Sequence, residues 1–437
     1  MPPTLPVAPP AATPTAPTRD RAIDVARLGA LMMVMFGHCA LLLATIDASG
    51  VRVGNLLGEI PAIQPLTWVV QVMPLFFLAG GAAGAYGCHT GTSWGTWLFT
   101  RAQRLCRPVF WYLAAWSIGL LVLRSTLGAD SAARLGGECV ALLWFLGVYL
   151  VVLAFVPGLT RLRSGRAVAV LLAVLLAAAA VVDQIRFAVG APEAGGLNFV
   201  VVWLIPVVIG VAYARGLITS RAAIAGAAAA FTAQVALVLV GAYDVSLVVT
   251  GVERISNTGP PTFLLALHCT WMSCVFVAAA GAIRRWAARP AVWRVVAVGN
   301  GGAMTLYLWH IPAIAVAAFS LHALGFDAYD VHAPSFWAVL ALRAVVFAFL
   351  MAVMFRLLSP LEHRALPWWD NAVEDIAARG TGVRSTMAGA LVCVGGVAVL
   401  LLAKFGLGDV AGWWAMGGFL VSAATARQLL SHAVIHR

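Results

Sequence analysis

Charged residues are the scarcest class in this chain of 437 residues. Only 10% of the residues are Asp, Glu, Lys or Arg, and Lys404 is the only lysine. Soluble domains average about 25% charged residues, so the shortage argues against a large soluble protein. The formal net charge is +11, but the arginines are spread over short segments. They form no single basic face, which excludes nucleic acid as the expected partner.

Paired cysteines and the common catalytic motifs are also missing. The seven cysteines are scattered, odd in number and without a CxxC pair, which argues against both a disulfide framework and a zinc site. We expect them to be small buried side chains, and we expect no metal. The chain contains no P-loop, GxSxG, HExxH or Rossmann glycine pattern, so those nucleotide, hydrolase and protease sites are not predicted.

The chain is instead rich in long apolar runs. Hydrophobic residues make up 62% of the chain, and runs of about 18 or more residues are long enough to cross the hydrocarbon of a bilayer. The pattern predicts an all-α, polytopic membrane bundle of about twelve transmembrane helices. Their expected limits are 22–46, 66–88, 108–127, 139–157, 167–187, 197–214, 222–242, 262–283, 299–322, 335–358, 387–404 and 409–428.

Arginines alternate between the two sides of the predicted bundle. Short connections such as 101–107, 161–166 and 284–294 are rich in arginine, and the connections between them carry mainly Asp and Glu. The positive-inside rule then predicts a cytoplasmic (inner) membrane protein with both termini in the cytoplasm. Residues 1–18 are rich in Pro and Ala and carry no charge, so we expect a disordered cytoplasmic tail followed by an uncleaved first helix.

Arg27 and His38 are the first candidate site residues, and both lie in the first predicted span. They are eleven positions apart, so at about 100° per residue they share one helix face. An ionisable group at the depth of His38 costs about 2.5–3.5 kcal/mol. His38 is either a histidine bonded within the helix packing or a general base. Arg27 either anchors the helix or contacts a phosphate-rich ligand.

Three further segments carry candidates with an alternative structural explanation. Arg101, Arg104 and Arg107 follow one another at i, i+3 and i+6, so they mark the cytoplasmic side or bind phosphates. In the stretch 255–263, Ser256, Asn257 or Thr258 is expected to cap a helix, unless the segment contacts an acceptor. His310 is a second histidine inside a span, followed by Pro312, and His268 is a weaker third candidate. Gly80 and Gly84 suit close helix packing.

These pieces together resemble the acyltransferase family 3 of integral-membrane O-acyltransferases. The resemblance rests on Arg27-x10-His38, the FFLAGG segment, the RAQRLCRP arginine cluster, YLWHIP around His310 and the segment 255–262. It implies an acyltransferase membrane core over 19–360. A cytoplasmic loop (361–386) and an additional C-terminal transmembrane hairpin with its tail (387–437) would follow. Ala79 stands where many members have Ser, so no role is expected for that hydroxyl.

The resemblance also implies a function. Members move an acyl group, here expected to be acetyl, from cytoplasmic acyl-CoA to a hydroxyl of an extracytoplasmic carbohydrate, lipid-linked or small-molecule acceptor. By this resemblance, His38 and Arg27 are expected to be the catalytic pair. The cluster Arg101, Arg104 and Arg107 is expected to contact CoA. Asn257 and His310 are expected to contact the substrate. The alternative is a secondary transporter or lipid exporter that uses buried His and Arg for proton coupling.

Overall fold

The computed structural model describes residues 20–48, 50–88, 91–370 and 382–431, and it confirms the all-α membrane bundle. The first half contains α1 (Arg21–Leu41), β1 (Leu42–Asp47), β2 (Gly50–Asn55), α2 (Leu56–Glu59), the 3₁₀ helix η1 (Pro61–Leu66), α3 (Thr67–Val70), α4 (Met73–Tyr86), α5 (Trp94–Leu127), α6 (Ala129–Ala141), α7 (Trp144–Leu153) and α8 (Val156–Leu159). The second half contains α9 (Gly165–Val189), the 3₁₀ helix η2 (Pro192–Gly195), α10 (Asn198–Ala214), α11 (Ser220–Leu239), α12 (Phe263–Ala287), α13 (Pro290–Gly301), α14 (Ala303–Ala323), α15 (Phe336–His363), α16 (Pro367–Asp370), α17 (Gly382–Phe405) and α18 (Val410–Ser431).

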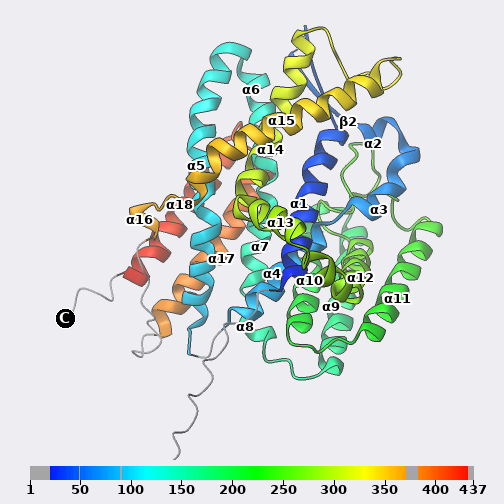
Figure 1. The fold of residues 1–437 in the computed structure, drawn as a ribbon, viewed down its shortest axis with the longest axis vertical. Coiled ribbons are helices and arrows are strands. Elements are labelled where there is room, and N and C mark those ends of the chain that lie inside the picture. The colour runs from blue at the N-terminus through cyan, green and yellow to red at the C-terminus, as the bar shows by residue number, and fades with distance from the viewer. Residues whose placement is uncertain (1–19, 49, 89–90, 371–381, 432–437) are drawn as a thin grey trace, which may run out of the picture.

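Eleven helical segments of the described chain are long and apolar enough to cross a membrane, against about twelve predicted. The twelfth expected span forms α18, but its glycines, its two tryptophans and Arg427 dilute its apolar character. α18 packs along α17 at one edge of the bundle (Figure 1). The expected tail at 1–18 lies outside the described residues, and so does most of the expected loop 361–386, of which α16 is a described part. The predicted division into core and hairpin stays a prediction.

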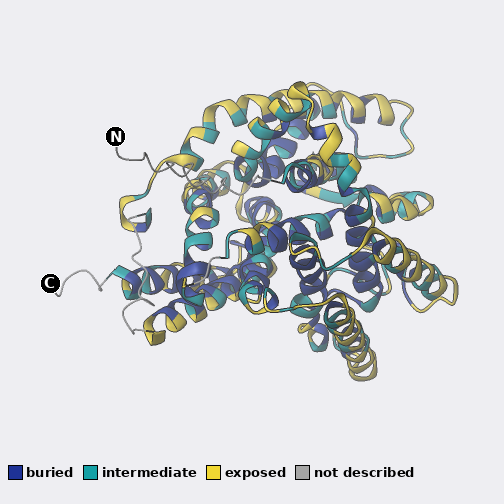
Figure 2. Cartoon of the chain, turned by 60° about the horizontal axis from the view of Figure 1, so that its bottom comes forward, coloured by how far each residue is buried: buried dark blue, intermediate teal, exposed yellow. Residues whose placement is uncertain are grey.

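The interior and the periphery of the bundle differ in burial. α10 and α12 are largely buried, whereas α9 and α11 expose most of their surface. Figure 2 shows the exposed helices around a dark-blue interior. Because apolar side chains cover the exposed helices, that surface suits contact with lipid. α1 packs against α4, α12, α14 and α15, and half of its spanning window is buried, so it has one face in the bundle interior and one exposed face.

Asp20 fixes the beginning of α1. Its carboxylate accepts a hydrogen bond from the amide of Ala22, which is a side-chain N-cap. The hydroxyl of Tyr213 donates to the same carboxylate at 2.7 Å, the hydroxyl of Tyr86 donates at 3.3 Å, and Arg284 forms an ion pair at 3.6 Å. One residue therefore ties the start of α1 to α4, α10 and α12.

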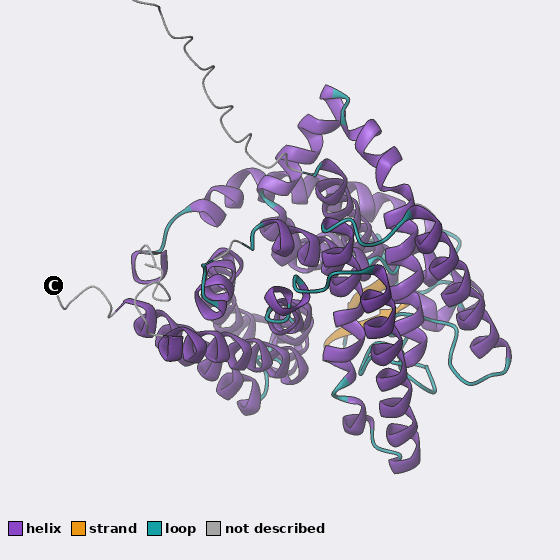
Figure 3. Cartoon of the chain, turned by 90° about the horizontal axis from the view of Figure 1, so that it is seen from below, coloured by secondary structure: helices purple, strands orange, loops and turns teal. Residues whose placement is uncertain are grey.

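The end of α1 corrects the first predicted span. The helix ends at Leu41 instead of residue 46, because residues 42–47 form β1, which pairs antiparallel with β2. This hairpin holds the only strands of the described chain (Figure 3). Thr45 and Ile46 of β1 are β-branched, as are Val51 and Val53 of β2, and such residues favour strands. Gly50 adopts the positive φ of 101° that the turn requires.

A network of polar groups holds the segment 255–262. The buried carboxylate of Asp183 accepts hydrogen bonds from the hydroxyl of Tyr243 at 2.9 Å and the amide of Phe263 at 2.6 Å. Arg186 donates to the carbonyl of Pro260 at 3.3 Å. The N-cap of α12 is Thr262, so the expectation of a cap among residues 256–258 was wrong. Thr262 caps because its hydroxyl accepts a hydrogen bond from the amide of Leu265, while Asp183 accepts from the amide of Phe263.

Glu253 closes the loop that precedes this segment. Its carboxylate accepts hydrogen bonds from the amide and hydroxyl of Thr250 and from the amide of Gly251. Partial burial alone would raise the pKa of Glu253, but these hydrogen bonds outweigh burial and lower it. The carboxylate therefore stays ionised, and its stabilising effect on the loop is lost only as the pH falls through the lowered pKa.

Gly210 allows the closest approach between α10 and α4. A Cβ atom at Gly210 would lie 2.1 Å from the carbonyl oxygen of Leu78, so we expect Gly210→Ala to destabilise the fold by about 1–3 kcal/mol through overpacking. Thermal unfolding of the purified protein measures the effect. Gly137→Ala is the control, because a Cβ there meets nothing within 4 Å. Equal melting temperatures for the two variants would contradict the prediction.

Candidate active site

His38 and His310 form a pair inside the bundle. His38 lies in the last turns of α1, and His310 lies in the middle of α14. Nδ1 of His38 is 2.9 Å from Nε2 of His310. The two rings are nearly parallel, with an interplanar angle of 14° and centroids 5.1 Å apart. The structure thus joins two of the sequence-predicted site residues by a direct hydrogen bond.

The hydrogen-bond partners determine which nitrogen of each ring carries a proton. Nδ1 of His310 lies 2.6 Å from the carbonyl oxygen of Tyr307, and a carbonyl can only accept, so this nitrogen is the donor. In a neutral imidazole the other nitrogen is then an acceptor, so Nε2 of His310 accepts from Nδ1 of His38. His38 consequently carries its proton on Nδ1 and presents an unprotonated Nε2. That is the form a general base requires.

The two histidines differ in accessibility. His310 is completely buried, with 0% of its surface exposed, whereas His38 is exposed. His310 therefore has no surface with which to meet a ligand in this conformation, and His38 does. The pair consists of an accessible residue and a buried residue that hydrogen-bonds to it from behind.

Several contacts fix the position of α14 and of His310. The carboxylate of Glu362 accepts from the amide and the hydroxyl of Thr305, both at 2.9 Å, and so caps the first turn of α14. The hydroxyl of Tyr307 donates to the carbonyl of Leu142. Pro312 removes one backbone donor from the helix. These constraints hold the Tyr307 carbonyl where it can orient the His310 ring.

Arg27 lies on α1 nearer the Asp20 end than His38. It is half-buried, and no hydrogen bond or ion pair joins its guanidinium to another described residue. Its charge and that of Arg101 both act on the hydroxyl of Tyr149. A Cβ atom at Gly80 would lie 2.4 Å from that hydroxyl, so the glycine allows Tyr149 to reach this place. The charges of Arg27 and Arg101 therefore both act on one tyrosine, which the sequence did not indicate.

The three arginines of α5 lie in different environments. α5 begins at Trp94, not at residue 108 as predicted, so all three lie within one helix. Arg101 lies over the ring of Trp97 at 3.7 Å and donates to the carbonyl of Gly87 at 3.1 Å. Arg104 is exposed. Arg107 already forms a two-point ion pair with Asp370, with distances of 2.8 and 2.6 Å, which holds α16 against α5.

Asn257 is fully engaged in the fold, whereas His268 is engaged through Nε2 alone, since its Nδ1 is buried and bonds no described residue. The amide nitrogen of Asn257 donates to the carbonyls of Asp244 and Ser246, and its oxygen accepts from the hydroxyl of Thr262. His268 is buried and hydrogen-bonds the carbonyl of Gln71 at 2.7 Å. Neither residue joins the pair of His38 and His310, and the substrate-binding role of Asn257 stays a prediction.

Sequence analysis missed Arg343, a fully buried arginine of α15. It donates a hydrogen bond of 2.6 Å to the carbonyl of Cys39, the residue after His38. The available signal was its position inside the predicted span 335–358, because a charged residue at such depth is a functional candidate by default. Thr45, His322 and Asp327 also gather near the end of α1. They carried no sequence signal, since they come from segments far apart.

The described residues contain no cluster of candidate metal ligands. No group of three or more His, Cys, Asp or Glu side chains there is placed to hold a metal ion. The seven cysteines are all free, and five of them are buried.

Comparison with known proteins gives one match. A family model described as an acyltransferase domain matches residues 20–353, which contain α1 and α14 and therefore both members of the histidine pair. No curated protein and no solved structure matches the chain.

Proposed function

The chain belongs to acyltransferase family 3 and is a membrane acyltransferase, and from this we propose that it transfers an acyl group from acyl-CoA to a hydroxyl of an acceptor, with His38 as the general base. The observation that carries the proposal is the pairing of His38 with His310, which leaves Nε2 of His38 unprotonated on an exposed residue. We further propose that the acyl group is acetyl and that the acceptor is an extracytoplasmic carbohydrate, lipid-linked or small molecule.

The reaction needs one proton to move twice. Nε2 of His38 takes the proton of the acceptor hydroxyl while its oxygen attacks the thioester carbonyl. The new carbon–oxygen bond forms, and the carbon–sulfur bond then breaks. The same Nε2–H protonates the departing thiolate, so the products are an ester and free CoA, and His38 returns to its neutral form. Throughout, the Nδ1–H of His38 stays bonded to His310.

Direct transfer fits this site better than a covalent acyl-enzyme intermediate. A nucleophilic serine or cysteine needs a base within hydrogen-bond distance. No hydroxyl or thiol of the described residues is hydrogen-bonded to His38, whose ring bonds to His310 instead. The base therefore acts on the hydroxyl of the acceptor.

The donor side of the proposal uses the arginines near Tyr149. A planar, permanently charged guanidinium suits the phosphates of CoA. Arg27 has no protein partner among the described residues, and Arg104 is exposed on α5. Arg101 is half-buried on the same helix, and its charge acts on Tyr149 as that of Arg27 does. Arg107 already neutralises Asp370, so we assign it the weakest part in binding CoA. This side of the bundle faces the cytoplasm if the positive-inside rule holds.

Arg27→Gln tests the donor side. Loss of one charge-assisted hydrogen bond, worth about 1.5–3 kcal/mol, is expected to raise the KM for acyl-CoA about 10- to 100-fold and to change kcat less. Steady-state kinetics with varied acetyl-CoA measure this. Arg163→Gln is the control, because this exposed arginine lies in the loop between α8 and α9. An unchanged KM in Arg27→Gln would reduce Arg27 to an anchor of α1.

The decisive test of the function separates acyl transfer from transport. Purified protein in nanodiscs receives acetyl-CoA labelled in the acetyl group together with a hydroxyl acceptor. We expect label in an ester and stoichiometric release of free CoA thiol. Protein in liposomes is assayed in parallel for net flux of the unmodified acceptor. Flux without thioester consumption would overturn the proposal in favour of a transporter.

A further inference from the structure

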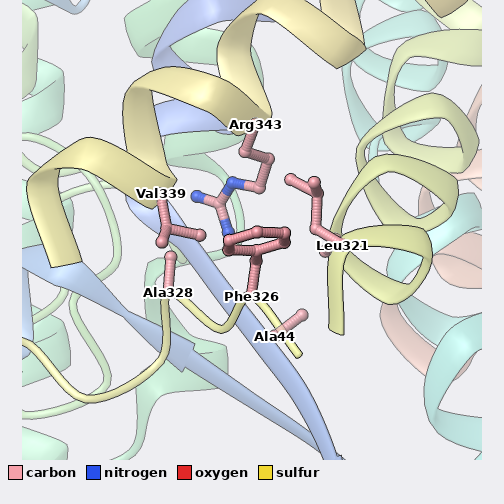
Figure 4. A pocket seen from close by; sticks show the side chains of 7 residues that line it. Ala44, Leu321, Phe326, Ala328, Val339 and Arg343 are labelled. Atoms are coloured by element: carbon pink, nitrogen blue, oxygen red, sulfur yellow. The ribbon is translucent and has the colours of Figure 1, made fainter. Parts of the chain in front are cut away.

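A small pocket lies beside the end of α1, where β1, the end of α14, the following loop and α15 meet (Figure 4). Six apolar side chains and one charged side chain, Arg343, line it. Its free volume of about 10 Å³ is enough for about one water molecule or one hydroxyl oxygen. The pocket is too small for a whole substrate but large enough for one oxygen of a substrate.

Among the described residues, Arg343 is the only polar side chain that lines this pocket. It is 2% exposed, and its Nη2 donates to the carbonyl of Cys39 at 2.6 Å. Nε is buried and bonds no described residue. Figure 4 shows the guanidinium pointing among the lining side chains, toward the ring of Phe326. A buried guanidinium with an unused donor is costly unless a further acceptor reaches it.

Asp327 determines which kind of acceptor suits Arg343. The negative charge of Asp327 acts on Arg343. One oxygen of its carboxylate accepts from Thr45 at 2.5 Å and lies 2.8 Å from Nδ1 of His322, and the other oxygen is buried without a partner. A second anion here would be repelled by Asp327. A neutral oxygen, which accepts from Arg343 without adding charge, fits better.

The pocket lies next to the catalytic histidine along the chain. Arg343 binds the carbonyl of Cys39, the residue that follows His38. It also lies at the end of α1 that leads into the hairpin of β1 and β2, opposite the end that Asp20 fixes. The positive-inside rule assigns that end to the extracytoplasmic side, from which the acceptor is proposed to arrive.

From these observations we infer that the Arg343 pocket is an acceptor subsite. Arg343 donates a hydrogen bond to a neutral oxygen of the acceptor that neighbours the hydroxyl acylated at His38. The inference rests on the proposed function and deepens it, because it requires an acceptor with at least two neighbouring oxygens. An alcohol with a single hydroxyl lacks the second oxygen and gains nothing from Arg343.

Two acceptors with the same alkyl chain test the subsite. Octyl glucoside offers neighbouring hydroxyls, and 1-octanol offers one. We expect wild type to prefer octyl glucoside and Arg343→Gln to lower kcat/KM for octyl glucoside about tenfold through KM, with 1-octanol unchanged. The glutamine amide can still donate to the Cys39 carbonyl, which preserves the end of α1. A retained preference for octyl glucoside would overturn the subsite. An equal loss for both acceptors would overturn it in favour of a purely structural cap of α1.

Arg427→Gln is the matched control. Arg427 of α18 is also a buried arginine with guanidinium nitrogens that bond no described residue, but it lies near Asp370 and not near α1. We expect this variant to keep the wild-type preference between the two acceptors. Methyl glucoside in place of octyl glucoside shows whether the acceptor comes from water or from the membrane, since the two share their hydroxyls.

A binding measurement tests the subsite independently of the proposed function. Equilibrium binding of octyl glucoside, below its micellar concentration, is measured in nanodiscs without acyl-CoA. Arg343→Gln is expected to bind about tenfold more weakly than wild type, and His38→Gln to bind nearly as wild type does. If wild type consumes no thioester, the function fails while this result still decides the subsite. Equal binding by wild type and Arg343→Gln would overturn it.

Discussion

Replacing His38 by glutamine is expected to lower kcat for acyl transfer about 10²- to 10⁴-fold, the range typical of a general base. Glutamine retains an N–H that can donate to Nε2 of His310, so the contact between α1 and α14 survives while the base is lost. Acetyl transfer from acetyl-CoA under saturating substrates measures the effect, and the KM for acetyl-CoA should change little. Retained turnover would remove His38 from the mechanism.

His268→Gln is the control for this experiment. His268 is another histidine of a membrane-spanning helix, but it is buried and bonds a backbone carbonyl and not another side chain of the site. Its replacement is expected to lower stability and to leave the kcat of the folded protein near the wild-type value. A loss as large as that of His38→Gln would mean that any histidine within a membrane-spanning helix here is needed for the fold, and kcat would no longer identify the base.

His310→Leu is expected to lower kcat about 100-fold with the KM for both substrates nearly unchanged. His310 is a positioning residue, since it is completely buried and acts through His38. Without its acceptor nitrogen, His38 is free to carry its proton on Nε2, which is the wrong form for a base. A wrong tautomer costs about 10⁴-fold in the Ser-His-Asp triad. We expect less here, because His310 is neutral and stabilises the imidazolium less than a carboxylate does.

The conservative variant His310→Gln distinguishes positioning from packing. The oxygen of its side-chain amide can accept the Nδ1–H of His38, so kcat should recover at least tenfold relative to His310→Leu. A merely structural histidine would give variants that differ in stability and not in kcat. Equal kcat values for the two variants, measured on equally folded protein, would contradict the role assigned to His310.

The sequence identified the ionisable residues of the site but not their partners. His38 and His310 stand out because both are histidines within apolar runs, yet their hydrogen bond joins residues 272 positions apart. Helix periodicity shows which residues share a helix face but not which faces pack together. This contact could therefore be found only in the structure. The same holds for Arg107, whose spacing suggested a phosphate contact, while its partner Asp370 comes from a distant segment.

Hydropathy predicted most helices and failed where an apolar run continues past the end of a helix. Residues 42–46 are as apolar as the helix before them, although they form a strand. Only their β-branched residues indicate the change, and this signal is weak over five residues. Helix ends that are fixed by capping residues distant in the sequence could not be predicted either. Asp183 binds the first amide of α12 from 80 residues away, which selects Thr262 as the cap.

The neutrality of the histidine pair has a consequence for how the protein is made. α1 is synthesised first, and His310 follows 272 residues later, which takes about 15–55 s at translation rates of about 5–20 residues per second. During this interval His38 lies in the nascent bundle without its hydrogen-bond partner His310. An aspartate or a permanently charged residue would resist insertion for that time. An imidazole can stay uncharged during this interval, so orienting His38, the proposed base, by a second histidine leaves no charge in lipid during assembly.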